Sequence, residues 1–138
     1  MHNADDVLSF VGRPFDSWTA IRSLFDPMVE LQVEREACGG CPIGTLIGQL
    51  AEVDESARLT LADAFARWEA RLRDGLRSMQ LQGKLEAGAD VGELAATTLA
   101  AMQGGLLLTQ ARRDPRQLAM ALDAAYSHLR AHAARNNM

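Results

Sequence analysis

Hydrophobic and polar positions follow helical spacing in every long segment of the chain. The least polar run covers residues 94–108, where only three polar side chains interrupt the hydrophobic ones. Those three are spread around the helix, so none of its faces is polar. Such a helix must be covered from several directions. Asp90 can cap its first amides, and Glu93 three residues later completes a capping-box pattern. We therefore expect a central buried helix over residues 90–113.

A second long helix is predicted between Asp54 and Gln82. Asp54 or Ser56 can cap its start, and Gly83 suits a left-handed cap at its end. Apolar residues recur there every three or four positions, which is the spacing of one helix face. They are Leu61, Phe65, Trp68, Leu72, Leu76 and Met79. A helix with such a stripe must bury it against neighbouring helices along its whole length.

The first clear helix follows Asp16 or Ser17, either of which can serve as its cap. Its apolar positions are Trp18, Ile21, Phe25, Met28 and Val29. Pro27 lies inside this pattern, where it lacks an amide and clashes with the preceding turn. We expect a kink or a break near residues 25–26.

The last helix is predicted to be capped by Asp114 and to start at Pro115. Its inward stripe is Leu118, Leu122, Ala125 and Leu129, which Met120, Ala121 and Tyr126 widen. Small and apolar residues on more than half of its circumference suggest a second burial surface. Gly104 and Gly105 lie inside the preceding helix, where each costs roughly 1 kcal/mol relative to Ala. We therefore expect them to allow a second backbone to approach.

The composition supports one helical domain. The chain has 138 residues, enough to bury a core without disulfides, and only seven aromatic residues. Good helix formers fill the long segments, so we predict an all-α fold of about six helices. We expect residues 1–14 to be a remnant or linker and residues 15–138 to form the domain.

Residues 38–53 contain the most distinctive stretch. Gly39 and Gly40 precede Cys41, and Pro42 takes the first position of a predicted helix, where its missing amide costs nothing. The segment GCPIGTL, residues 40–46, resembles the GCPxGNL signature of the C-terminal domain of TetR-family transcriptional regulators. Thr45 stands where Asn is common in that signature.

The order of the segments that follow is also similar to that family, and the resemblance covers roughly residues 15–132. It implies a ligand-binding and dimerisation domain whose last two helices pair with those of a second copy in a four-helix bundle. The N-terminal helix-turn-helix of the family is missing from the sequence, so we expect DNA binding only through a part outside this chain.

Large apolar side chains around few polar ones are typical of a pocket for a small apolar or amphipathic molecule. Thr98 and Gln103 are the candidate polar groups that would orient this ligand. The expected ligand-binding residues are Trp18, Phe25, Met28, Leu46, Phe65, Trp68, Leu72, Thr98, Met102 and Gln103. For any one of the aromatics, a plain core role is the alternative. The expected dimer residues are Leu99, Gly104, Gly105, Leu107, Leu118, Ala121, Leu122, Ala125, Tyr126 and Leu129.

Charge and sequence motifs argue against several classes of function and location. A net charge of −4 and 13 scattered Arg residues with one Lys argue against nucleic-acid binding by this chain. No signal peptide opens the sequence, and the run 94–108 is short for a membrane span, so we expect a cytoplasmic protein without membrane contact.

Two residue pairs have metal-ligand spacing. Cys38 and Cys41 form a C-x-x-C pair, and His128 and His132 lie one helical turn apart. The two pairs are 86 residues apart, and nothing in the helix order brings them together. No nucleophile, base and orienting group stand out either, so we expect no enzyme, metal or cofactor.

The sequence therefore predicts the effector-binding and dimerisation domain of a TetR-like repressor. The alternative is a free-standing helical dimerisation or adaptor module without a ligand.

Overall fold

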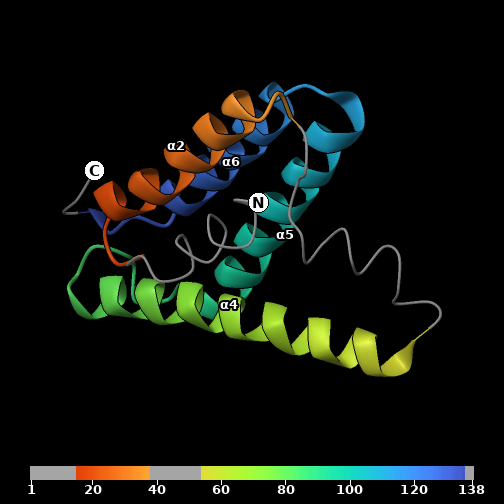
Figure 1. Ribbon diagram of the computed structural model, residues 1–138. Helices are drawn as coiled ribbons and strands as arrows, with labels where there is room; N and C mark the ends of the chain where they lie inside the picture. The colour runs from red at the N-terminus through yellow and green to blue at the C-terminus, as the bar shows by residue number, and fades with distance from the viewer. Residues whose placement is uncertain (1–14, 38–53, 136–138) are drawn as a thin grey trace.

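The computed structural model describes residues 15–37 and 54–135, which form four helices and no strand. The helices are α2 (Trp18–Glu34), α4 (Glu55–Leu81), α5 (Val91–Arg112) and α6 (Arg116–Arg130). In Figure 1, α4 lies along one side of the molecule, α2 and α6 lie on the other, and α5 crosses between them. The all-α prediction is confirmed. The helix expected after Pro42 lies outside the described residues, so the predicted number of six is not.

Local signals set the starts of α2, α4 and α5 where the sequence predicts them, whereas α6 begins at Arg116, with Pro115 and not Asp114 at the cap position. The side chain of Ser17 accepts a hydrogen bond from the Ala20 amide at 3.0 Å, and Asp54 accepts one from the Ala57 amide at 3.1 Å. Asp90 caps α5 in the same way through the Glu93 amide, at 3.1 Å. Gly83 follows α4 with φ of 76°, a left-handed conformation that glycine adopts without steric cost.

Of the kink or break expected near residues 25–26, the break is wrong, because α2 runs through Pro27 to Glu34, and the kink stays a prediction. A proline inside a helix costs about 3 kcal/mol or more. Phe25 and Met28 on either side of it are buried, and burial of each contributes roughly 1.5–3 kcal/mol. The Arg22–Asp26 ion pair also spans this turn, with 2.6 Å between nitrogen and oxygen. These contacts offset the lost hydrogen bond.

The centre of the core is α5, which packs most extensively on α6 and next on α4. Gly105 makes the α5–α6 seam possible. A Cβ at this position would lie 2.9 Å from Leu118 Cδ1 and 3.1 Å from the Leu118 Cα. In the same seam, the Leu118 amide donates a hydrogen bond to the buried Thr109 Oγ1 at 2.9 Å. The predicted close approach at the glycine pair therefore occurs within one chain, at Gly105.

By length and composition alone, α5 could also cross a membrane. Val91, Leu94, Ala95, Leu99, Met102 and Leu106 belong to the buried core, so other helices cover one side of α5. Its other side, with Leu107 and Leu108, stays exposed within the chain.

The loop after α4 is held by the C-terminal end of the chain. The Glu86 amide donates to the His132 carbonyl at 2.9 Å, and the Ala134 amide donates to the Lys84 carbonyl at 3.1 Å. Gln80 Nε2 donates to the Ala89 carbonyl at 2.8 Å from within α4. The start of α5 is therefore fixed from two sides.

Candidate ligand and dimer surfaces

Most of the residues predicted to bind a ligand meet in one buried cluster formed by α2, α4 and α5. Its members among them are Phe25, Met28, Trp68, Leu72 and Met102, with Trp18 and Phe65 partly buried against it. The same cluster continues into α6 through Leu118, Leu122, Ala125 and Leu129, and Thr98 is buried separately as a polar residue. Leu46 lies outside the described residues. The α2 backbone packs mainly on α6 and makes no comparable contact with α4. The side chains that the sequence predicts to lie together therefore do so, as part of the hydrophobic core.

The two predicted polar groups of this cluster differ. Thr98 donates its hydroxyl hydrogen to the Leu94 carbonyl of the same helix at 2.8 Å. Gln103 is half-buried, and its buried Nε2 has no hydrogen-bond partner among the residues that the structure describes. Of these two, Gln103 has a donor left for another molecule, and the buried Trp18 Nε1 is likewise unpaired among the described residues.

The sequence analysis did not single out Gln32, which carries a second unpaired amide. This residue is 2% exposed and lies on the buried face of α2, one turn after Met28. Its Oε1 atom is buried and has no partner within residues 15–37 and 54–135. Its spacing from Phe25 and Met28 could have revealed it, but a search for apolar stripes passes over a polar residue.

The residues predicted for the dimer fall into two groups. One group packs inside the chain: Leu99, Leu118, Leu122, Ala125 and Leu129 are buried, and Gly105 is covered by α6. Tyr126 is also occupied, since its ring meets Trp18 edge-on with 6.0 Å between centroids. The other group is open: Leu107 is 64% exposed, and a Cβ at Gly104 would meet nothing within 4 Å. Ala121 lies between them at the seam.

An outer face of small and apolar residues follows the α5–α6 seam. We use this name for Ala100, Gly104, Leu107, Leu108, Met120 and Ala124. Those on α5 recur at helical spacing on the side opposite its buried stripe. Those on α6 flank Ala121, which meets α5 at Gly105. Both sets are therefore exposed on the two helices that form the seam.

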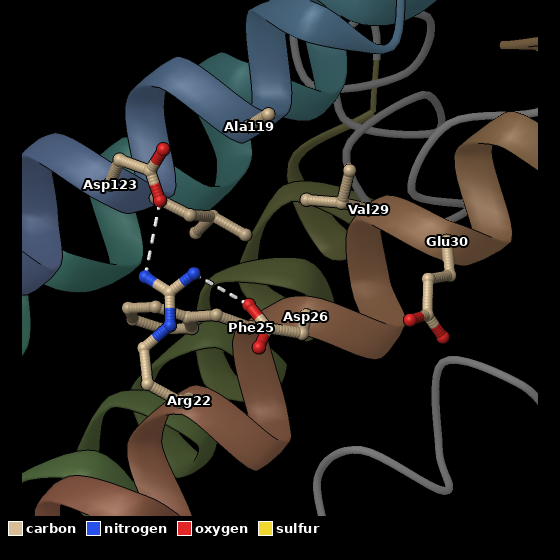
Figure 2. Close-up of a pocket in the computed structure, with 8 residues that line it drawn as sticks. Arg22, Phe25, Asp26, Val29, Glu30, Ala119 and Asp123 are labelled. Atoms are coloured by element: carbon tan, nitrogen blue, oxygen red, sulfur yellow. Dashed lines mark hydrogen bonds and ion pairs between the residues drawn. The ribbon is translucent and has the colours of Figure 1, made fainter.

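A groove of about 260 Å³ separates α2 from α6 (Figure 2). Phe25, Val29, Ala119 and Leu122 supply its apolar walls, and Asp26, Glu30 and Asp123 lie around it. Figure 2 shows the Arg22 guanidinium between two carboxylates, 2.6 Å from Asp26 Oδ1 and 3.1 Å from Asp123 Oδ1. Arg22 thus links α2 to α6 across the groove.

Electrostatics favour the charged form of this link. Partial burial lowers the pKa of the Arg22 guanidinium, but the hydrogen bond to Asp123 and the charges of Asp26 and Asp123 outweigh it, so the pKa is raised above its ordinary value. The guanidinium also lies 5.0 Å from the centroid of the Tyr126 ring. One turn away, the Arg130 guanidinium lies 4.6 Å above the Trp18 ring. Charged and aromatic side chains therefore contribute to the contact between α2 and α6, beside the apolar residues that line the groove.

No group of three or more His, Cys, Asp or Glu residues suited to a metal occurs in the described parts of the chain. The rings of His128 and His132 lie edge to face, with 5.4 Å between centroids, and His132 Nδ1 is 2.9 Å from Glu86 Oε1. The Cys38–Cys41 pair lies outside the described residues. His132 therefore helps to hold the loop before α5.

Comparison with known proteins identifies the family. A family model described as "Transcriptional regulator LmrA/YxaF-like, C-terminal domain" matches residues 17–124, which include α2, α4, α5 and most of α6. Searches of curated proteins and of solved structures gave no match. The resemblance based on GCPIGTL is thus confirmed by a match over most of the chain. The chain belongs to the TetR-family transcriptional regulators, as a C-terminal regulatory domain of the LmrA/YxaF-like type.

Proposed function

We propose that this domain forms a homodimer through its outer face and senses a small apolar or amphipathic effector in the space between α2 and α4. Ligand binding would be passed through the residues before α2 to a DNA-binding domain of the regulator. A repressor acting in the cytoplasm, without an enzymatic activity of its own, fits this role and the family.

The observation that carries the proposal is the open surface at Gly104. A helix that tolerates a glycine where no neighbour approaches loses about 1 kcal/mol relative to Ala and gains nothing within the subunit. Leu107 and Met120 beside it are 64% and 57% exposed. A two-fold axis through this surface would bury the same patch on both subunits and bring the two backbones close at Gly104.

The effector site is supported by composition and by the attachment of α2. Phe25, Met28, Trp68 and Met102 supply large and adaptable apolar surface, and Gln32 and Gln103 each retain one unpaired polar atom among the described residues. Because α2 is attached mainly to α6, it can shift relative to α4 without breaking a tight backbone contact. A ligand moves such an equilibrium only if it binds one arrangement better than the other.

Replacing Met120 with Arg tests the dimer. The variant places a charge on the outer face, so we expect it to sediment as a single chain where the wild type sediments as two. Leu59→Arg is the matched control, since Leu59 is 54% exposed on α4, away from the seam. A wild-type chain that sediments singly at all concentrations, or a Met120→Arg variant that still pairs, would rule out this interface.

The alternative is a dimerisation or adaptor module without a ligand, whose aromatics are only core. Native mass spectrometry of the protein purified from cells separates the two. A dimer with additional small-molecule mass supports the effector site. A dimer that carries none, and whose thermal unfolding no compound of an apolar library shifts, favours the adaptor.

A further inference from the structure

Residues 32 and 33 at the end of α2 are arranged against the usual rule of burial. The Gln32 amide is 2% exposed, whereas the neighbouring Val33 is 60% exposed. A buried acceptor without a hydrogen bond costs free energy, and an exposed valine forgoes the gain of burial. Local rules broken in this way are expected where a residue serves a function and not stability.

The register of α2 explains why the helix does not simply rotate to correct this. Gln32 lies four residues after Met28 and seven after Phe25, so the three share one face at helical spacing. Turning Val33 inward would turn Phe25 and Met28, both buried, partly out of the core. The amide is therefore held on the same face of α2 as Phe25 and Met28, two residues of the proposed effector site.

The turn that ends α2 is hydrogen-bonded to the main chain of Gln32. The Ala37 amide donates to the Gln32 carbonyl at 2.8 Å, and Glu36 and Ala37 both adopt left-handed conformations, with φ of 53° and 60°. The main-chain oxygen of Gln32 is thus used by this turn. Its side-chain oxygen is not used by any residue that the structure describes.

We infer that Gln32 is a specificity-determining residue of the effector site, where its Oε1 accepts a hydrogen bond from the ligand. This rests on the proposed function and narrows its ligand class. The effector is a compact, mostly apolar molecule with an N–H or O–H donor on one edge. A site that offers an otherwise unpaired buried acceptor discriminates against an analogue that lacks the donor, because the acceptor then stays unpaired.

The test uses two probes that differ only in the donor. Indole carries an N–H group on a flat apolar body, and 1-methylindole carries a methyl group there. Both are titrated into the isotope-labelled full chain, and affinities are read from amide chemical shifts. We expect indole to bind about tenfold more tightly to the wild type. In Gln32→Leu the difference should disappear, whereas Gln82→Leu, a glutamine replacement at the exposed end of α4, should retain it.

The outcomes separate this inference from the proposed function. Equal binding of the two probes to the wild type, or a preference for indole that survives in Gln32→Leu, would show that Gln32 is a core residue only and leave the effector site standing. If neither probe shifts the amides of α2, α4 or α5, both the site and the role of Gln32 are rejected. Gln32→Leu removes a buried acceptor that has no partner among the described residues, so its thermal midpoint should not fall, and this confirms that the variant is folded.

Discussion

The α5–α6 seam and the α2–α6 contact share one helix but are held by different forces. In the seam, a glycine and small side chains bring two backbones together, and a buried hydroxyl pairs with the Leu118 amide. Between α2 and α6, Arg22 bridges the exposed carboxylates of Asp26 and Asp123. Guanidinium groups lie over the aromatic rings there, and a groove separates the two helices. Close packing tolerates little displacement, whereas exposed ion pairs are each worth about 0–1 kcal/mol. The difference indicates that the α5–α6 seam is a rigid frame suited to subunit pairing, and that α2 is an adjustable wall suited to ligand sensing.

The largest expected effect comes from truncating the seam. Leu118→Ala should lower the free energy of unfolding by about 2–5 kcal/mol, because it leaves a cavity where a fully buried side chain stood. Val29→Ala in the groove should cost about 1 kcal/mol or less, since this residue is only half-buried. Urea denaturation at one protein concentration measures both. Equal losses would remove the distinction between the two regions.

The adjacent glycines provide the next test. Gly105→Ala places a Cβ 3.0 Å from Ala121 Cβ and should destabilise the fold by about 1–3 kcal/mol through overpacking. Gly104→Ala meets nothing within the subunit and should stabilise α5 by up to about 1 kcal/mol. The pair is best compared in the Met120→Arg background, where subunit pairing is removed. A stabilising Gly105→Ala would contradict the close approach of α6.

Breaking the link between α2 and α6 should have a smaller effect. Asp123→Asn removes one of the two carboxylates that hold Arg22, and we expect a loss of no more than about 1 kcal/mol. The indole N–H resonance of Trp18 should nevertheless shift, because Trp18 contacts Tyr126 on the same side of α6. Asp63→Asn, which breaks the exposed Asp63–Arg67 pair of α4, is the control and should leave this resonance unchanged.

The smallest effect is expected from acid. The hydrogen bonds that Asp114 accepts from the side chain and then the backbone of Arg116 lower the pKa of its carboxyl. A lowered folded-state pKa contributes stability that is present above the unfolded value, about 4, and is lost as pH falls through the folded value. Asp114→Asn should therefore flatten the dependence of the unfolding midpoint on pH below about 4. An unchanged slope would mean that this pair contributes nothing.

The sequence predicted what is determined locally. Ser17, Asp54, Asp90 and Gly83 act as caps because each satisfies backbone groups within three or four residues, so no tertiary knowledge is needed. The stripe of α4 likewise identifies its own buried face. These signals sufficed for the four helices and the fold class.

The sequence could not determine which face of an apolar helix meets which neighbour. Residues 94–108 are apolar all round, so periodicity gave no means to separate Gly105, covered by α6, from Gly104, open to solvent. The positions of Leu118 and Leu122 in the sequence are equally compatible with a core and with a subunit interface, and both residues are buried in the core of the chain. The spacing of Gln32 from Phe25 and Met28 places it on their face, but that its Oε1 lacks a partner follows only from the packing of α2.

Hydrogen exchange of the full chain, resolved by helix, tests the contrast between frame and wall most directly. The account predicts that amides in the middle of α5 and α6 exchange at least about tenfold more slowly than those of α2, because opening α2 breaks few close contacts. It also predicts that Asp123→Asn speeds exchange in α2 alone. Exchange in α2 as slow as in α5, or an Asp123→Asn effect spread evenly over α5 and α6, would contradict it.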